Sequence, residues 1–282
     1  MIKKRPRTNW HEAITCAIQI DLRDYAHLLE YHTEYTLSAN GNHMDMLIIK
    51  KHSEFQIPKH IASIFKTHNI FEIKGLKNSL TTDAYYKTNG HAGYYIDSYA
   101  ENNTLKRNDI SLTFPALHYP RNLFRHLRKD CNKIIENPYP GIYYILDEMY
   151  ATQVLVISEL SPEDSLYLYC LTDNLKNPNL INTLTKDFEI NKDNPIYTKY
   201  MNQFFYSHMK GEQLMVCEGL LNYFGTSSKE IAENATKQTQ EFYQPQIEKL
   251  TSDNILLTSE NTLLHSEIAK YKKLLEENNI SY

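Results

Sequence analysis

Three charged side chains on two short apolar stretches could together hold a metal ion. Asp45 interrupts the apolar run of residues 44–49, and Glu72 and Lys74 close a second run that begins at Ile70. Both runs predict β-strands, in which alternate side chains share a face, so Glu72 and Lys74 are expected on one face, about 7 Å apart. Two carboxylates on adjacent strands, with a lysine beside them, can hold a hard divalent cation and position a water molecule. This is the chemistry of metal-dependent phosphodiester cleavage.

The same spacing also fits an ion pair between strands, or charges on a solvated strand face. Glu72-Ile73-Lys74 is the only acidic-x-lysine tripeptide in the chain, yet so short a motif is only a hypothesis by itself. Asp45 argues against the purely structural alternative, because ionised groups seldom interrupt so apolar a run for packing reasons alone.

A series of blocks extends the pattern over roughly the first 200 residues. The blocks are residues 10–13, 18–25, 44–51, 64–70, 72–74, 86–90, 118–121, 141–144 and 158–161. In this order they resemble the PD-(D/E)XK nuclease superfamily, and within it the branch of the recombination-promoting nucleases and related transposases. One departure is Met44, which stands where the name of the superfamily implies proline.

The resemblance implies roles for the residues of the two strands. Asp45 and Glu72 would ligate Mg²⁺ or Mn²⁺, with the backbone carbonyl of Ile73 as a third oxygen. Lys74 would orient or help deprotonate the attacking water, or stabilise the charge that builds on the phosphate.

The resemblance also draws in residues of two expected helices. Glu12 matches a position where the superfamily often supplies a further acidic group, although the helix dipole also favours a glutamate in a first turn. Its neighbour His11 is expected to be structural. Tyr86 and Lys87 match positions that face the site, where Lys87 could contact phosphate and Tyr86 could equally belong to the core.

Charge is unevenly distributed along the chain. The net charge is −4, but residues 211–282 carry 11 acidic and 6 basic residues, a net of −5, which leaves +1 for residues 1–210. Residues 1–8 form a basic arm. Four more cations fall at near-helical spacing and form a stripe expected to bind DNA phosphates: Arg121, Arg125, Arg128 and Lys129. The alternatives are a disordered start and a solvated helix face.

Hydrophobic periodicity predicts an α/β fold that begins with the element order α-β-β-β-α-β, followed by helices and a C-terminal coiled coil. The resemblance implies that this order forms a restriction-endonuclease-like core with a mixed central sheet. Helices are expected at residues 9–28, with Asn9 as N-cap, and at 61–66 and 83–99. Strands are expected at 29–36, 44–51, 70–74, 110–114, 142–146 and 153–157. Asn40-Gly41 indicates a hairpin turn, and Ser161-Pro162 indicates the start of a helix.

This organisation predicts five segments. They are the basic arm 1–8, a nuclease-like domain 9–160, a helical extension 161–224, a linker or helix 225–246 and a coiled coil 247–277.

The coiled coil is predicted from strict three-four spacing of mostly apolar residues. The seam residues are Ile247, Leu250, Asn254, Leu257, Asn261, Leu264, Ile268, Tyr271 and Leu275. Two asparagines at a positions favour a parallel two-stranded register, and therefore a homodimer, although the same zipper could recruit a different chain. Leu256 and Leu263 lie off the seam and leave open a single amphipathic helix packed on the body of the protein.

The sequence lacks the signals of three kinds of protein: membrane or secreted proteins, cysteine-based frameworks and nucleotide-dependent enzymes. No apolar run approaches ~18 residues, and the start has no apolar stretch typical of a signal peptide, so no membrane partner is expected. The four cysteines are far apart, without a Cys-x-x-Cys motif, which favours a reducing compartment, by default the cytoplasm. The 8 glycines form no phosphate-binding loop, so no nucleotide cofactor is expected.

The sequence therefore predicts a cytoplasmic, Mg²⁺- or Mn²⁺-dependent DNA endonuclease linked to recombination or a mobile element. The alternative is a catalytically inactive nuclease fold that binds DNA or acts as a scaffold, assembled through its coiled coil.

Overall fold

The structure, a computed structural model, describes most of the first 208 residues and part of the C-terminal region. The described residues are 10–37, 43–52, 54–75, 79–98, 105–172, 178–208 and 251–275, the last range without 253, 255, 256, 263 and 274. The chain divides into two compact units, Thr8–Tyr223 and a second unit of Met1–Arg7 with Phe224–Tyr282.

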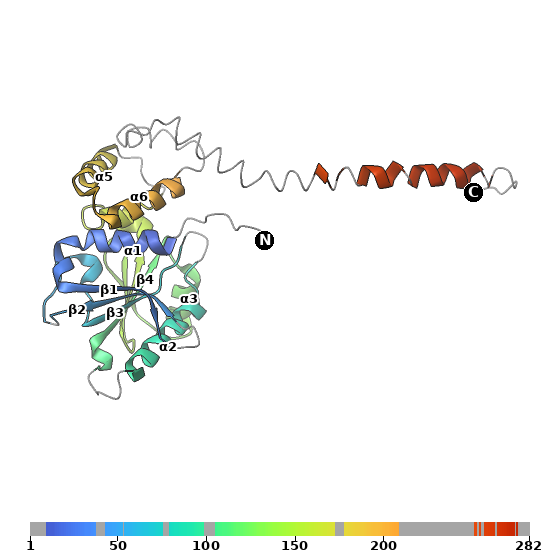
Figure 1. The fold of residues 1–282 in the computed structure, drawn as a ribbon. Helices are drawn as coiled ribbons and strands as arrows, with labels where there is room; N and C mark the ends of the chain where they lie inside the picture. Colours follow the sequence, from blue (N-terminus) through green and yellow to red (C-terminus); the bar gives the residue numbers. More distant parts are fainter. Residues whose placement is uncertain are drawn as a thin grey trace. The chain divides into compact units, whose positions relative to one another are not determined.

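A mixed seven-stranded sheet forms the centre of the first unit (Figure 1). Its strands are β1 (Leu29–Thr36), β2 (His43–Lys50), β3 (His68–Phe71), β4 (Ile110–Ala116), β5 (Ile135–Tyr139), β6 (Ile142–Ile145) and β7 (Ala151–Val156). The spatial order is β1-β2-β3-β4-β7-β6-β5. The pairs β3–β4 and β4–β7 are parallel, and the other pairs are antiparallel.

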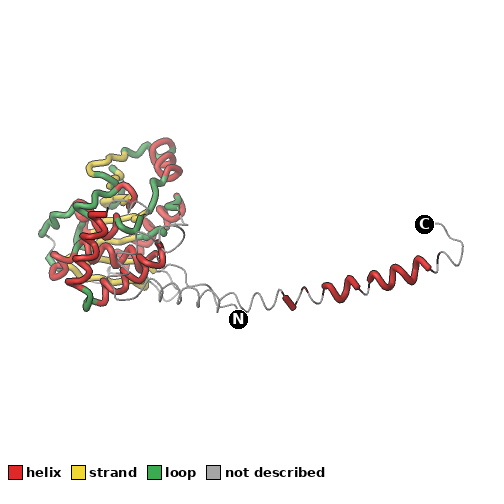
Figure 2. The backbone as a smooth tube through the Cα atoms, turned by 90° about the horizontal axis from the view of Figure 1, so that it is seen from above, coloured by secondary structure: helices red, strands yellow, loops and turns green. Residues whose placement is uncertain are grey.

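Helices cover both faces of this sheet. They are α1 (Trp10–Asp21), α2 (Thr82–Ser98), α3 (Arg121–Lys129), α4 (Leu166–Tyr169), α5 (Pro178–Asn191) and α6 (Pro195–His208). Short 3-10 turns are η1 (Arg23–Leu28), η2 (His60–Ala62), η4 (Arg107–Asp109) and η5 (Ile157–Glu159). Figure 1 shows α1, α5 and α6 on one side of the sheet and α2 and α3 on the other, and Figure 2 shows the strands between the helices.

The centre of the sheet holds the core. Every residue of β4 is buried, as expected for a strand with parallel neighbours and helices over both faces. On the side of α2 and α3, the core includes Ile70, Leu112, Phe114 and Val154. The α/β class with a mixed sheet and several helices is thus confirmed.

Most expected elements are present, but the bounds of several differ from the prediction and one strand was not predicted. The first helix ends at Asp21 and continues only as the 3-10 turn η1. The expected helix 61–66 is reduced to η2, and strand β5 was not predicted. The predicted helix start at Ser161-Pro162 is wrong: these residues form a turn closed by the Ser165 N–H on the Ser161 carbonyl at 3.0 Å, and α4 begins only at Leu166.

A side chain at the end of α1 explains where α4 starts. The Asp21 carboxylate accepts hydrogen bonds from the main-chain nitrogens of Tyr167 and Leu168, each at 3.0 Å. These are donors in the first turn of α4, which has no intrahelical acceptor for them. The N-cap of α4 is therefore supplied from a residue 146 positions away in the chain.

The described part of residues 251–275 is helical and solvent-exposed along most of its length. Leu257, Leu264, Ile268 and Tyr271 of the predicted seam are large exposed apolar residues on this segment. Ile247, Leu250, Leu256 and Leu263 lie outside the described residues, as do the basic arm, Asn9 and the Asn40-Gly41 turn. Among the helices that the structure describes, none combines the length and apolarity needed to cross a membrane.

Candidate active site

Asp45 and Glu72 lie where strands β2 and β3 separate. The last residues joined in the antiparallel register are Met46 and Phe71, so Asp45 and Glu72 come next on the two strands. Here the Asp45 side chain replaces the backbone ladder, because its Oδ2 accepts a hydrogen bond from the Ile73 nitrogen at 2.6 Å. The predicted strand 70–74 accordingly ends at Phe71 on this side.

On its other side, the segment after β3 stays attached to β4. The Glu72 nitrogen donates to the Thr113 carbonyl at 3.1 Å, and the Lys74 nitrogen donates to the Pro115 carbonyl at 2.9 Å. Ile73, between them, is fully buried. The acidic-x-lysine tripeptide is therefore held by a central strand, while Asp45 reaches it from the neighbouring strand.

Glu72 and Lys74 point to the same side and form an ion pair. The Lys74 Nζ lies 2.5 Å from the Glu72 Oε1, and both side chains are largely buried. The expectation of a shared face is met, and the two side chains close on each other.

His11 is the closest charged partner of Asp45. The His11 Nδ1 lies 3.3 Å from the Asp45 Oδ1, and the His11 side chain is 49% exposed against 11% for Asp45. The hydrogen bond with Asp45 raises the pKa of His11 above its ordinary value, against the opposing effect of burial. Burial alone would raise the pKa of Asp45, but the hydrogen bond and charge of His11, with the Ile73 N–H and Lys74, hold it below its ordinary value. His11 is thus part of the candidate site, and it is the more exposed member of the His11–Asp45 pair.

Glu12 points toward helix α6. Its Oε2 accepts a hydrogen bond from the Gln203 Nε2 at 2.9 Å. Its charge also raises the pKa of Cys16, one turn further along α1, although burial is the larger cause. Sequence reasoning placed Glu12 in the site and treated His11 as structural. The two are consecutive on a helix and about 100° apart, so the rotation of α1 decides which one reaches Asp45.

Helix α2 brings further polar groups to the same region. His91 is buried, and burial lowers its pKa, assisted by the Lys87 cation and opposed by Glu72 and Asp45. Within the part of the chain that the structure describes, the His91 Nδ1 is buried without a hydrogen-bond partner. Lys87 lies one turn before His91 on this helix and is exposed. Lys87 and the two carboxylates therefore act on the same imidazole, from opposite directions.

Tyr86 is not in the core, which was one of the two positions expected for it. It is 49% exposed, so it is not a core residue. Its hydroxyl lies 2.9 Å from the His126 Nε2 of helix α3, a contact that joins the two helices.

The oxygen donors at the end of β2 and β3 suit a hard divalent cation. Two carboxylates and the main-chain carbonyl of Ile73 are the ligand types that Mg²⁺ and Mn²⁺ prefer. Across the described ranges, no three His, Cys, Asp or Glu side chains form a ready metal-binding group. Mg²⁺ usually keeps several waters and is bound by only one or two carboxylates, so these two carboxylates match the coordination that it prefers. Lys74 pairs with the Glu72 carboxylate, and His11, when protonated, pairs with that of Asp45.

The predicted basic stripe lies on helix α3. All four cations are exposed, while Leu123, Phe124 and Leu127 of the same helix are buried. The exposed cations are Arg121, Arg125, Arg128 and Lys129. In the regions that the structure describes, none of them forms an ion pair with a carboxylate, so their charge is free to attract phosphate.

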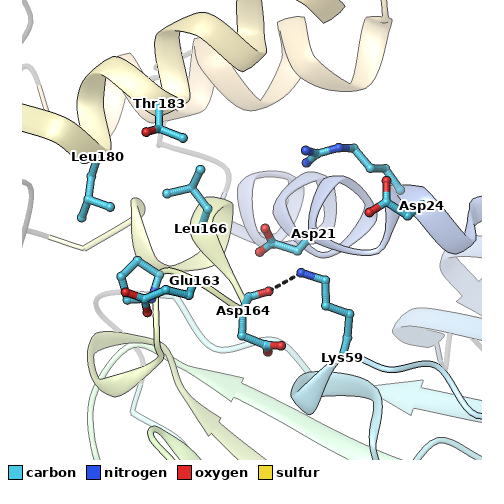
Figure 3. A pocket seen from close by; sticks show the side chains of 10 residues that line it. Asp21, Asp24, Lys59, Glu163, Asp164, Leu166, Leu180 and Thr183 are labelled. Carbon is cyan, nitrogen blue, oxygen red and sulfur yellow. Dashed lines mark hydrogen bonds between the residues drawn. The ribbon is translucent and has the colours of Figure 1, made fainter.

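A pocket of about 350 Å³ lies at the opposite end of α1 and was not predicted. Its lining includes Asp21, Lys59, Asp164 and Leu166, and the Lys59 Nζ donates to the Asp164 carbonyl at 2.7 Å (Figure 3). Burial raises the pKa of Asp21 to about 7, although its two backbone hydrogen bonds act in the opposite direction. The pocket shares no lining residue with the tripeptide or Asp45.

Comparisons with models of protein families, with curated proteins and with solved structures give no match for this chain.

Proposed function

We propose that the chain is a Mg²⁺- or Mn²⁺-dependent DNA endonuclease with a restriction-endonuclease-like core, linked to recombination or a mobile element. The proposal rests on one observation above all. Asp45 and Glu72 follow the last paired residues of two adjacent strands, Asp45 accepts the Ile73 N–H between Glu72 and Lys74, and Lys74 is bonded to Glu72. His11, which is 49% exposed, gives this cluster its contact with solvent, while the Asp45 and Glu72 side chains are largely buried.

Different residues would position the carboxylates, donate hydrogen bonds to the reacting groups and bind the flanking phosphates. The Ile73 N–H and His11 hold the Asp45 carboxylate in place. Lys74 can donate to the attacking water or to a phosphate oxygen, while Lys87 and the α3 cations can bind the flanking phosphates. A divalent ion held by Asp45, Glu72 and the Ile73 carbonyl would stabilise negative charge on the phosphate. Water attack breaks one P–O bond and leaves the two DNA ends.

The alternative function is an inactive nuclease fold that binds DNA or acts as a scaffold. One observation favours it: each carboxylate of the pair already has a cationic partner, Lys74 for Glu72 and His11 for Asp45. Such pairs can serve the fold alone, because breaking a buried pair leaves an uncompensated charge.

Cleavage of supercoiled plasmid DNA separates the two functions. The intact protein is tested with Mg²⁺ and with Mn²⁺, beside Asp45→Ala and Lys74→Ala. The matched controls are Glu136→Gln and Lys186→Ala, which alter exposed residues on β5 and α5. The endonuclease proposal expects metal-dependent nicking or linearisation that both site substitutions abolish and both controls retain. DNA binding without cleavage by the intact protein would favour the scaffold.

A further inference from the structure

A second cluster of reactive side chains lies at the C-terminal end of helix α3. His126 and Asp130 are four residues apart and therefore neighbours on the helix surface. The His126 Nδ1 lies 2.7 Å from the Asp130 Oδ2. A carboxylate accepts hydrogen bonds and does not donate them, so this contact places a proton on Nδ1 and leaves the Nε2 lone pair available.

The backbone after α3 brings a cysteine to that lone pair. Asn132 adopts a left-handed conformation, with φ of 53°, which asparagine tolerates better than most residues. The chain turns back, and the Lys133 nitrogen donates to the Leu127 carbonyl at 2.8 Å. As a result, the Cys131 Sγ lies 3.5 Å from the His126 Nε2.

Helix α2 adds a hydroxyl to the cluster. The Tyr86 hydroxyl lies 2.9 Å from the His126 Nε2 and 3.3 Å from the Cys131 Sγ. When Nε2 takes the thiol proton, the new Nε2–H and the Tyr86 O–H can both donate to the thiolate sulfur. Such an arrangement of nucleophile, base and orienting carboxylate is what activates a cysteine.

The other described cysteines lie in different surroundings. Cys16 and Cys170 are buried. Burial raises the pKa of Cys16 to about 11 and that of Cys170 to about 12, so both remain thiols at neutral pH. Cys131 is partly exposed and has an exposed tyrosine beside it. A reagent in solution therefore meets Cys131 in preference to the two buried thiols.

We propose that Cys131 is a reactive thiol that exchanges with small-molecule disulfides, with His126 as its base. The His126 Nε2 takes the thiol proton, and the Cys131 sulfur attacks one sulfur of the disulfide. A new S–S bond forms as the old one breaks, and the departing thiolate takes the proton back from His126. The Cys131 sulfur is thereby oxidised to a mixed disulfide, and one sulfur of the reagent is reduced to a thiol.

The position of Cys131 gives this exchange a consequence for the basic surface. Cys131 follows Lys129 by two residues at the end of the helix that carries the four exposed cations. An anionic adduct such as a glutathionyl group would partly cancel their charge and displace the Tyr86–His126 contact. This second step rests on the proposed DNA function, whereas the exchange itself does not.

The exchange is tested with oxidised glutathione and the full chain at pH 7. The adduct on Cys131 is quantified by mass spectrometry of the peptides, and the rate is compared with that of the urea-unfolded chain. An ordinary cysteine is only a few per cent thiolate at pH 7, so activation should raise the rate on Cys131 by about 10-fold or more in the folded protein. His126→Gln should return the rate to the level of the unfolded chain, and Tyr86→Phe, which keeps the ring, should lower it by a smaller factor.

His27→Gln, an exposed histidine in η1, is the matched control and should leave the rate unchanged. Circular dichroism shows whether each variant is folded, and Asp130→Asn replaces His126→Gln if the latter is not. A rate on Cys131 no higher than in the unfolded chain would overturn the proposal. So would a rate unaffected, in a folded variant, by loss of the base or of the Asp130 carboxylate that orients it.

DNA binding by the modified protein tests the consequence separately. The glutathione adduct should weaken DNA binding, and a reductant should restore it, while Cys131→Ser should bind DNA alike before and after treatment. An adduct that leaves binding unchanged would overturn the consequence and not the exchange. Absence of DNA binding by the unmodified protein would count against the proposed function and not against the reactive thiol.

Discussion

At the scale of single residues, Asp45 is both a structural and a candidate catalytic group. Its carboxylate accepts the N–H of Ile73, whose side chain is fully buried, and it also pairs with His11. Substitutions can separate the two roles, because asparagine keeps an acceptor for the N–H and loses the charge.

We therefore expect Asp45→Ala to lower the free energy of unfolding by about 1–3 kcal/mol, the cost of an unsatisfied buried donor. Asp45→Asn should cost less than about 1 kcal/mol, since the hydrogen bond can be kept. Urea unfolding of the metal-free protein measures both. Equal losses for the two variants would show that the hydrogen bond to Ile73 is not what Asp45 contributes to the fold.

The His11–Asp45 pair predicts a pH window for stability. The raised pKa of His11 contributes stability below about pH 6.5 that is lost as the pH rises through the folded value. The lowered pKa of Asp45 contributes stability above about pH 3.9 that is lost as the pH falls through the folded value. His11→Gln should therefore destabilise the metal-free protein most near pH 5, by less than about 1 kcal/mol because His11 is half-exposed. Urea unfolding at pH 5 and pH 8 measures this, and an equal effect at both values would contradict it.

At the scale of elements, the junction between α1 and α4 depends on one buried carboxyl. Burial raises the pKa of Asp21 to about 7, so the folded protein keeps a proton that the unfolded chain has lost. The stability linked to this group is therefore full below about pH 4 and is lost as the pH rises to about 7.

We expect the wild type to lose up to about 4 kcal/mol of unfolding free energy relative to Asp21→Asn between pH 4 and pH 7.5. Asparagine cannot titrate, and all other groups cancel in the difference between the two proteins. Urea unfolding across this range gives the two profiles. Parallel profiles would mean that Asp21 has an ordinary pKa in the folded protein.

The exposed cations of helix α3 would supply the electrostatic part of the proposed DNA binding. Arg121 and Arg125 are exposed, while the Arg128 Nη1 donates to the Tyr119 hydroxyl at 3.2 Å. Replacing Arg121 or Arg125 by glutamine should weaken DNA binding uniformly across sequences and reduce the salt slope of the binding constant by about 1 each. Fluorescence anisotropy at several salt concentrations measures the slope, with Lys186→Gln as the control. Slopes equal to that of the wild type would remove α3 from the DNA interface.

The sequence predicts those elements best whose signals are local. Apolar runs located β2 and β4, because the burial of these strands follows directly from their own residues. The start of α4 and the end of β3 were misplaced because each is set by a side chain from elsewhere in the chain: Asp21 caps α4, and Asp45 accepts the Ile73 N–H.

In the candidate site, too, some contacts follow from the local sequence and others depend on packing. The Glu72–Lys74 contact follows from strand alternation, whereas the choice between His11 and Glu12 depends on how α1 is rotated against the sheet. The Cys131 cluster needed the packing of α2 on α3, although His126 and Asp130 carry the helical spacing that could have indicated it.

At the scale of the whole molecule, the exposed apolar residues of the C-terminal helical segment are predicted to pair with the same segment of a second copy of the chain. Leu257 and Leu264 are exposed and seven residues apart, the repeat of a coiled-coil seam. Pairing would bury them in a homodimer, which would bring two cleavage sites to one DNA molecule.

Replacing both leucines by aspartate should convert the proposed dimer to a monomer, since charges at seam positions oppose pairing. Sedimentation velocity measures the mass, and Ser259→Asp, an exposed position off the seam, is the control. A wild-type monomer, or a dimer that survives both aspartates, would remove the coiled coil from the account.

The central claim is that Asp45, Glu72 and Lys74 form one metal-dependent cleavage site. The most direct measurement is the initial rate of plasmid nicking by the intact protein and by Asp45→Asn in Mg²⁺ or Mn²⁺, after urea unfolding has shown that the variant is folded. The account predicts cleavage that depends on the metal and falls by about 100-fold or more in the variant. Cleavage at the wild-type rate by the folded variant, or none by the intact protein with either metal, would contradict it.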